Sequence, residues 1–216
     1  MDWLLGLALE KVRPDDHKMR ATIKGLIEIA QHDKAFADAE YEAGSPKTYA
    51  HYAISLWGGI ESALEQLMVN HLIVVPAAAA IVAGTPRGLS RAKIRIANDD
   101  EARDTVRRWQ SALQDPSALG GTLEMLRVFG VTVALSEADR RQMEELAQVR
   151  NVLLHRGGVV EGRATSKCPW MPWLPGETIQ LSEMRTRGYF DAAGQFALAL
   201  VMGVTESPHR TLMVAR

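Results

Sequence analysis

The sequence contains very little cysteine. Cys168 is the one cysteine among its 216 residues, so no disulfide can form within the chain. A zinc site built mainly from thiolates is excluded for the same reason. Because proteins of oxidising compartments usually carry paired cysteines, the composition favours a reducing, cytoplasmic location.

Long apolar runs are also missing. The most apolar stretch, residues 72–83, is shorter than the roughly 20 residues that span a bilayer, and Pro76 interrupts it. Residues 3–9 are apolar but lack the positive flank and the small-residue cleavage site of a signal peptide. We interpret residues 3–9 as the first turns of an amphipathic helix, and we expect no membrane partner.

The chain has no excess of positive charge. Its formal net charge is −1, whereas proteins that neutralise many phosphates are usually basic, so any nucleic-acid site must be local. Arginine outnumbers lysine by eighteen to seven. The forked guanidinium suits phosphate, although a GC-rich genome explains the same excess. With 47% hydrophobic and 24% charged residues, the chain can build one sizeable globular core.

Apolar residues recur at helical spacing along most of the chain. This pattern predicts an all-α fold, a helical bundle in a single domain of residues 1–216. The predicted helices cover about residues 16–30, 31–43, 47–75, 99–113, 121–129, 136–155 and 183–204. Between the last two helices, residues 159–160 and 178–181 are short extended candidates that can pair as a small β-hairpin.

The helix predicted over residues 47–75 carries Gly58 and Gly59 in its middle. Each glycine costs about 1 kcal/mol relative to alanine inside a helix. Close approach of another helix or subunit would compensate for this cost. A kink in the helix is the alternative.

Several common catalytic motifs are absent. The sequence has no glycine-rich phosphate loop, no nucleophile elbow and no helical His-Glu-x-x-His pair. Most of the histidines are scattered without ligand-like spacing, so we expect no metal and no cofactor. Trp170 and Trp173 lie in a proline-rich loop, where they can stack a nucleic-acid base or pack the loop onto the protein.

One group of residues stands out near the end of the helix predicted over residues 136–155. It consists of Arg150, Asn151 and His155, in the pattern Arg-Asn-x3-His, and two glycines follow it closely. Residue frequencies predict about 0.007 occurrences of this pattern in a chain of this composition. Chance is therefore a poor explanation of the pattern.

The helical spacing of these residues has a consequence for the site. Asn151 and His155 lie about 40° apart around the helix, whereas Arg150 and His155 lie about 140° apart. One chain cannot easily aim Arg150 and His155 at one atom, but two copies around a two-fold axis can. We therefore expect a homodimer with a composite site, in which this helix or the helix that carries the glycine pair lies at the two-fold contact.

These residue types suit RNA cleavage. Histidine can take and return a proton near neutral pH, and a guanidinium can stabilise the charge on a pentacoordinate phosphoryl group. If the 2′-hydroxyl of the RNA attacks, neither a metal nor a protein nucleophile is needed. The alternative is structural: Arg150 and Asn151 brace the helix end, and His155 closes it by bonding a carbonyl.

The sequence resembles the HEPN superfamily, whose signature is Arg-Asn-x3-His. Residues 146–160 carry this signature, and residues 57–64, with Glu61, look like the family's early helix with its acidic residue. Residues 178–189, which lead into the last predicted helix, look like the family's usual ending. The resemblance covers residues 33–203 as a HEPN-like core, and residues 1–32 are then an N-terminal helical extension.

The resemblance implies an all-α bundle, commonly dimeric, with the two motifs meeting at a cleft. It implies Arg150 and His155 as the catalytic pair and Asn151 as the polar group that positions them. It also implies Glu61 as the acidic partner facing Arg150, although a carboxylate on a helix surface is the simpler interpretation of Glu61. No cofactor is implied.

The resemblance leaves two functions open. Many members are metal-independent ribonucleases of toxin–antitoxin and other defence systems, so the first hypothesis has RNA as substrate and an antitoxin or inhibitor protein as partner. Other members are non-catalytic binding or scaffolding domains. The second hypothesis is accordingly a helical module that binds a partner protein or nucleic acid through the same cleft.

Overall fold

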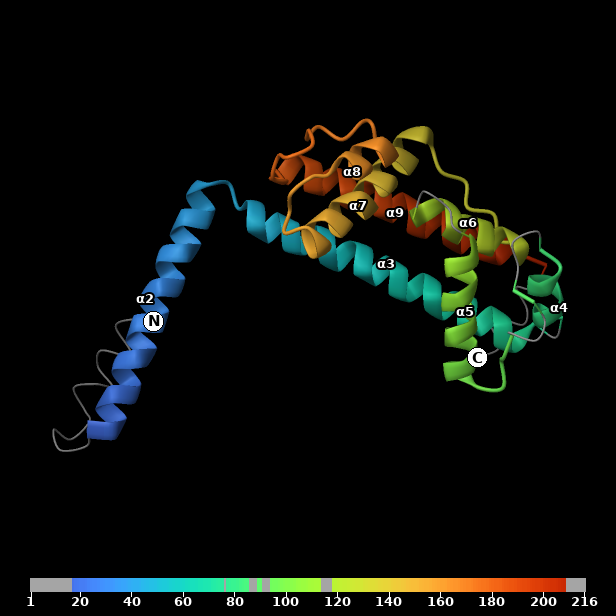
Figure 1. The fold of residues 1–216 in the computed structure, drawn as a ribbon, viewed down its shortest axis with the longest axis horizontal. Coiled ribbons are helices and arrows are strands. Elements are labelled where there is room, and N and C mark those ends of the chain that lie inside the picture. The colour runs from blue at the N-terminus through green and yellow to red at the C-terminus, as the bar shows by residue number, and fades with distance from the viewer. Residues whose placement is uncertain (1–16, 76, 86–88, 91–93, 114–117, 209–216) are drawn as a thin grey trace. The chain divides into compact units, whose positions relative to one another are not determined.

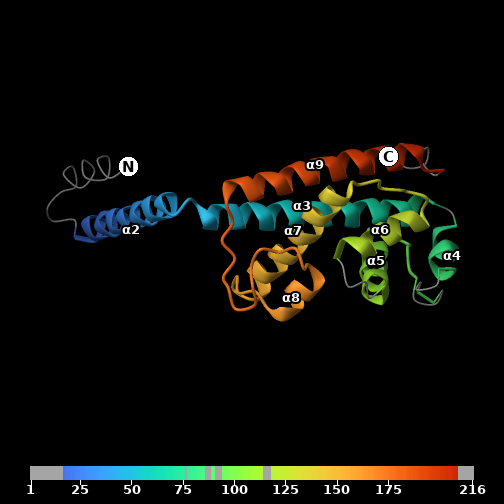
Figure 2. The same cartoon turned by 90° about the horizontal axis from the view of Figure 1, so that it is seen from above.

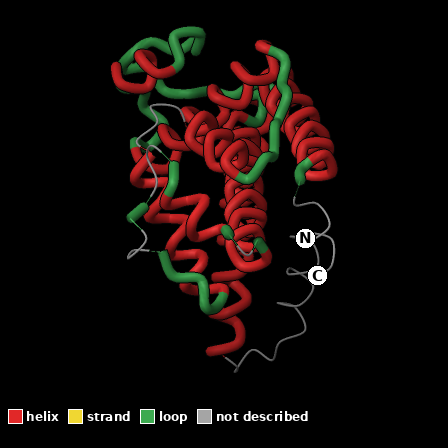
Figure 3. The backbone as a smooth tube through the Cα atoms, turned by 90° about the vertical axis from the view of Figure 1, so that its right-hand side faces the viewer, coloured by secondary structure: helices red, strands yellow, loops and turns green. Residues whose placement is uncertain are grey.

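The structure, a computed structural model, describes residues 17–75, 77–85, 89–90, 94–113 and 118–208. Within these ranges the chain forms helices and loops and no strand (Figure 3). The helices are α2 (His17–Glu42), α3 (Pro46–Val74), α4 (Ala78–Ala83), α5 (Asp99–Leu113), α6 (Ala118–Val128), α7 (Glu137–His155), α8 (Gly162–Lys167) and α9 (Glu183–Glu206). The prediction of an all-α fold is confirmed for the described residues.

Most helix predictions agree with the structure, and one is wrong. The predictions match α3, α5, α7 and α9 closely, and α6 to within a few residues. The two helices predicted over residues 16–30 and 31–43 are instead one helix, α2. No glycine or proline separates the two predicted segments, so nothing in the sequence breaks the helix there. The interpretation of residues 3–9 and the role of Pro76 lie outside the described residues.

The chain divides into two compact units between Thr48 and Tyr49. The first unit contains α2, which runs through residue 33 without a break. The second unit contains α4 to α9 and almost all of α3. The organisation inferred from the sequence, a single domain with an extension over residues 1–32, stays a prediction.

In the first unit, α2 ends in a tight turn. Gly44 adopts a φ of 79°, a conformation that favours glycine. The Glu40 carboxylate accepts hydrogen bonds from the backbone N–H groups of Lys47 and Thr48, at 2.5 and 2.9 Å. These bonds satisfy two of the N–H groups that the first turn of α3 would otherwise leave without a partner.

In the second unit, α7 packs against α9, α6 and α8, and α6 packs against α5. Figures 1 and 2 show that α3 and α9 run side by side. The core contains Trp109 and Phe129, both fully buried, with their rings edge to face at 5.9 Å. A Cβ at Gly203 of α9 would lie 2.3 Å from the carbonyl oxygen of Thr132, so a side chain there would force the two segments apart.

The predicted β-hairpin is reduced to a single antiparallel bridge, which pairs Val159 with Thr178. Backbone hydrogen bonds of 2.8–2.9 Å lie beside this bridge. Between the two bridge residues the chain forms α8, which the sequence analysis did not predict. Only Ala164 of this six-residue helix is buried, so its apolar pattern is too short to indicate a helix.

Candidate functional site

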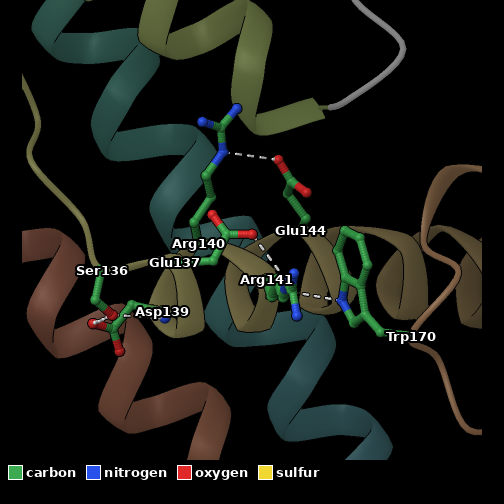
Figure 4. A network of polar contacts seen from close by, with 7 residues as sticks. All are labelled: Ser136, Glu137, Asp139, Arg140, Arg141, Glu144 and Trp170. Atoms are coloured by element: carbon green, nitrogen blue, oxygen red, sulfur yellow. Dashed lines mark hydrogen bonds and ion pairs between the residues drawn. The ribbon is translucent and has the colours of Figure 1, made fainter.

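Helix α7 carries the Arg-Asn-x3-His motif, and local interactions define both of its ends. At the first end, the Ser136 hydroxyl accepts the N–H of Asp139 at 3.1 Å, as an N-cap residue does (Figure 4). At the second end, Gly157 and Gly158 have φ values of 58° and 84°. The Gly158 N–H donates to the carbonyl of Val152 at 3.1 Å. The two glycines therefore stop the helix directly after the motif, as the sequence predicts.

A buried polar network holds α7 against α9. The Glu145 carboxylate, on a side chain that is 3% exposed, accepts a hydrogen bond from the Tyr189 hydroxyl at 2.6 Å. It also forms an ion pair with Arg185 at the start of α9. Because a buried carboxylate is costly unless paired, these partners fix how α7 lies on α9. The network lies one to two turns before the motif and limits how far the helix can move.

The Arg150 side chain extends toward α3. Its Nη2 donates to the Glu61 carboxylate at 2.9 Å, and its Nη1 donates to the side-chain oxygen of Asn151 at 2.9 Å. The structure thus brings Glu61, the acidic residue implied by the family resemblance, against Arg150. A catalytic role for either residue stays a prediction. The side chains are 22% and 45% exposed, so this ion pair lies near the surface.

One donor of Arg150 is left unsatisfied. Its Nε–H is buried and meets no acceptor within the part of the chain that the structure describes. A buried donor without a partner costs about 1–3 kcal/mol. A purely structural role fits Arg150 poorly, because a structural arginine would have all its buried N–H donors hydrogen-bonded.

His155 lies in a separate groove. Its imidazole is exposed and makes no hydrogen bond or ion pair with the described residues. The groove has a volume of about 320 Å³ and runs between the end of α7 and α8. Its polar lining includes Asn151, His155, Arg156, Glu161, Arg163 and Lys167.

Asn151 links the two parts of the motif. Its side-chain oxygen accepts from Arg150, and the residue also lines the groove that contains His155. Arg150 does not belong to the lining of this groove. Within one chain the motif is therefore divided into an Arg150–Glu61 pair toward α3 and a His155 groove toward α8, as the 140° angle between the two side chains requires.

Sequence reasoning missed the α8 side of the groove. Arg163 and Lys167 are four residues apart, so they project from one face of α8. Arg156 forms an ion pair with Glu161 at 3.2 Å. The Arg-x3-Lys spacing was the available signal, but it carries no meaning until the segment is known to be helical.

Trp170 and Trp173 pack onto the protein. The Trp170 Nε1–H donates to the carbonyl of Arg141 at 3.2 Å (Figure 4). The Arg185 guanidinium lies 5.2 Å from the ring centroid of Trp173, which is partly buried against the core. Of the two interpretations of this loop, these contacts support packing, although Trp170 remains 37% exposed.

Two buried side chains close to the Glu145 carboxylate, the Cys168 thiol and the Tyr189 hydroxyl, have raised pKa values. Burial, followed by the Glu145 and Glu144 carboxylates, raises the pKa of the Cys168 thiol to about 12. Burial and the Glu145 carboxylate raise the pKa of Tyr189 as well. Both groups are therefore protonated and uncharged in the folded protein at neutral pH, and Cys168 is not a nucleophile there.

These pKa shifts predict that the protein loses stability in alkali. A raised pKa in the folded state means that folding favours the protonated form. For the Cys168 thiol this stabilisation is complete below pH 9.0 and is lost as pH rises toward 12, and for the Tyr189 hydroxyl the loss begins only above pH 10.0. Each group makes the loss steeper by about 1.4 kcal/mol per pH unit. The free energy of unfolding, measured in urea between pH 7 and pH 11, should fall above about pH 9. The part contributed by the thiol should disappear in Cys168→Ala, and a flat profile in wild type would contradict these shifts.

The described residues offer no obvious metal site or membrane segment. No group of three or more His, Cys, Asp or Glu side chains in the described ranges is placed to hold a metal ion. None of the helices in those ranges combines the length and the apolar character needed to cross a bilayer. Comparisons with protein-family models, with curated proteins and with solved structures each find no match to this chain.

Proposed function

We propose that this protein is a metal-independent endoribonuclease that cleaves RNA by attack of the substrate's own 2′-hydroxyl. The observation that supports this proposal best is the arrangement around the end of α7. There, Glu61 and Asn151 hold two arms of the Arg150 guanidinium, and His155 presents an exposed imidazole with no protein partner among the described residues. A proton-transfer group and a phosphate-binding cation are the two groups that this reaction needs.

The reaction assigns a role to each residue. The 2′-oxygen attacks the adjacent phosphorus while His155 accepts the proton of the 2′-hydroxyl, and the resulting imidazolium then returns that proton to the leaving 5′-oxygen. The bond from phosphorus to the 5′-oxygen breaks, which leaves a 2′,3′-cyclic phosphate and a 5′-hydroxyl. Arg150 stabilises the charge on the pentacoordinate phosphoryl group. Glu61 and Asn151 position Arg150, since their side-chain oxygens accept hydrogen bonds from its nitrogens.

The proposal includes a homodimer, because Arg150 and His155 diverge within one chain. An exposed face on α3 and α9 suits such a contact. A Cβ at Gly58 or Gly59 would meet nothing within 4 Å, so no packing among the described residues compensates for these helical glycines. Nearby, the Tyr52 and Phe190 rings lie edge to face, with centroids 6.4 Å apart, and both side chains are about half exposed. Further along α9, Leu198 and Val201 are also exposed.

The proposed enzyme acts in the cytoplasm as a toxin or defence effector. An antitoxin or another inhibitor protein binds it and blocks its activity. The second candidate is a non-catalytic helical module that binds a partner through the same surface. The Arg150–Glu61 ion pair favours this alternative, because a guanidinium already paired with a carboxylate is partly neutralised. The two functions differ in whether the protein breaks a phosphodiester bond.

Incubation of purified protein with total RNA and with transfer RNA in EDTA tests the proposed function. We expect cleavage without divalent ions and fragments that end in a 2′,3′-cyclic phosphate, detected by mass spectrometry. A substrate with a 2′-deoxy nucleotide at the cleaved position should be inert, because it lacks the attacking hydroxyl. Loss of activity in EDTA with recovery in magnesium would contradict this mechanism, and binding of RNA without cleavage would favour the module.

A further inference from the structure

The groove that contains His155 extends beyond the groups that the proposed reaction uses. Its far wall is α8, where Arg163 and Lys167 line the groove. Neither side chain has a hydrogen bond or ion pair in the described part of the chain. Arg163 is exposed and Lys167 is partly exposed, so both charges are available to a ligand in solution.

The charge of the groove contrasts with that of the whole chain. Arg156, Arg163 and Lys167 line it against one carboxylate, that of Glu161, although the protein has a formal net charge of −1. The ion pair of Arg156 with Glu161, at 3.2 Å, neutralises that carboxylate. The two cations of α8 therefore remain as an unbalanced positive site, which attracts a strand of phosphates.

Other residues of α8 and its end hold this helix, and with it the two cations, beside His155. Ala164 of α8 is 7% exposed and Cys168, directly after the helix, is fully buried, so both anchor the helix to the core. The hydroxyl of Thr165 and that of Ser166 both donate to the Gly162 carbonyl, at 3.0 and 2.8 Å. The two basic side chains are consequently free to bind a ligand without any change in packing.

We propose that Arg163 and Lys167 form a second phosphate subsite, which binds the RNA phosphate next to the one that is cleaved. This inference rests on the proposed function, because it takes His155 as the group at the cleaved linkage. The substrate is then an RNA strand with at least two consecutive phosphodiester linkages in the groove. The subsite contributes to binding and does not take part in the proton transfers.

Binding of a fluorescent single-stranded RNA tests the subsite, with His155→Ala as the background so that the RNA stays intact. Anisotropy titrations over a range of salt concentrations give Kd and its salt dependence. Removing both cations in Arg163→Ala/Lys167→Ala should weaken binding about 25-fold at 0.1 M salt and make the logarithmic salt slope shallower by about 1.4. The substitutions should not impair folding, because neither side chain has a protein partner among the described residues.

A matched control removes the same net charge elsewhere. Arg127→Ala/Arg187→Ala deletes two arginines that are 74% and 72% exposed, outside the groove, and should leave the Kd and the salt slope nearly unchanged. A variant with the opposite effect is Glu161→Gln, which removes the carboxylate and releases Arg156. It should tighten RNA binding by about two- to fivefold.

A substrate with a single phosphodiester linkage separates the subsite from a general charge effect. When His155 is retained, the double variant Arg163→Ala/Lys167→Ala should raise KM for longer RNA. It should leave the cleavage of a dinucleoside monophosphate unchanged. An equal loss on both substrates, or wild-type Kd and salt slope in the double variant, would overturn the subsite. If wild type binds RNA with the expected salt slope but never cleaves it, the proposed reaction fails while the α8 phosphate site stands. Absence of RNA binding by wild type would overturn both.

Discussion

His155→Ala should lower the turnover of RNA cleavage by roughly two to four orders of magnitude, the usual loss on removal of a general acid or base. The melting temperature should stay nearly unchanged. The imidazole is exposed, and within the described ranges no hydrogen bond or ion pair involves it, so the substitution removes no interaction that stabilises the fold. Single-turnover cleavage assays and a thermal melt on the same preparation measure the two quantities.

The structural alternative for His155 predicts the opposite pair of results. If its imidazole closed the helix by bonding a carbonyl, the alanine variant would lose about 1 kcal/mol of stability, and activity would follow the folded fraction. In the structure, the backbone N–H of Arg156 bonds the Val152 carbonyl at the end of α7, and the His155 ring bonds no carbonyl of the described residues. His51→Ala, at an exposed histidine of α3, is the matched control and should change neither quantity.

Long amphipathic helices with sequence-encoded ends were predictable. Helix α5 begins at Asp99 and ends at Leu113 as predicted, because its first turn is acidic and the Asn98 side chain caps it through the N–H of Glu101 at 2.9 Å. The six-residue helices α4 and α8 were not predicted. A segment of that length shows too few helical repeats to give a pattern, and its conformation depends on packing that the sequence does not display.

The candidate site was predictable only where its residues lie on one helix. The angle between Arg150 and His155 follows from helix geometry alone, and the structure places the two side chains in different surroundings accordingly. The contact of Arg150 with Glu61 joins residues 89 positions apart, and only the family resemblance indicated it. The cations of α8 were missed, since no local pattern shows that residues after the glycine stop return to face the motif.

Because Arg150 and His155 point in different directions within one chain, substitutions of each residue test the composite site. Arg150→Ala should by itself lower turnover roughly a hundred- to a thousandfold, as removal of a group that stabilises transition-state charge does. Its stability should change by less than about 1 kcal/mol, because the lost ion pair is near the surface and the variant no longer buries the unpaired Nε–H. Arg140→Ala, an arginine of α7 paired with Glu144 at 3.2 Å, is the matched control and should keep full activity.

Two inactive variants should regain activity when they are combined in one dimer. If each site takes Arg150 from one copy and His155 from the other, a dimer of Arg150→Ala with His155→Ala contains one site with both residues and one with neither. Random pairing makes half of the dimers mixed, so coexpression should restore about one quarter of wild-type turnover. Differently tagged copies allow the mixed dimer to be isolated, and light scattering at micromolar protein reports the oligomeric state. Activity that stays at the level of the single variants would place both residues of each site in one chain. A monomer in light scattering would rule out the composite site, and the long Arg150 side chain would then have to reach His155 within its own subunit.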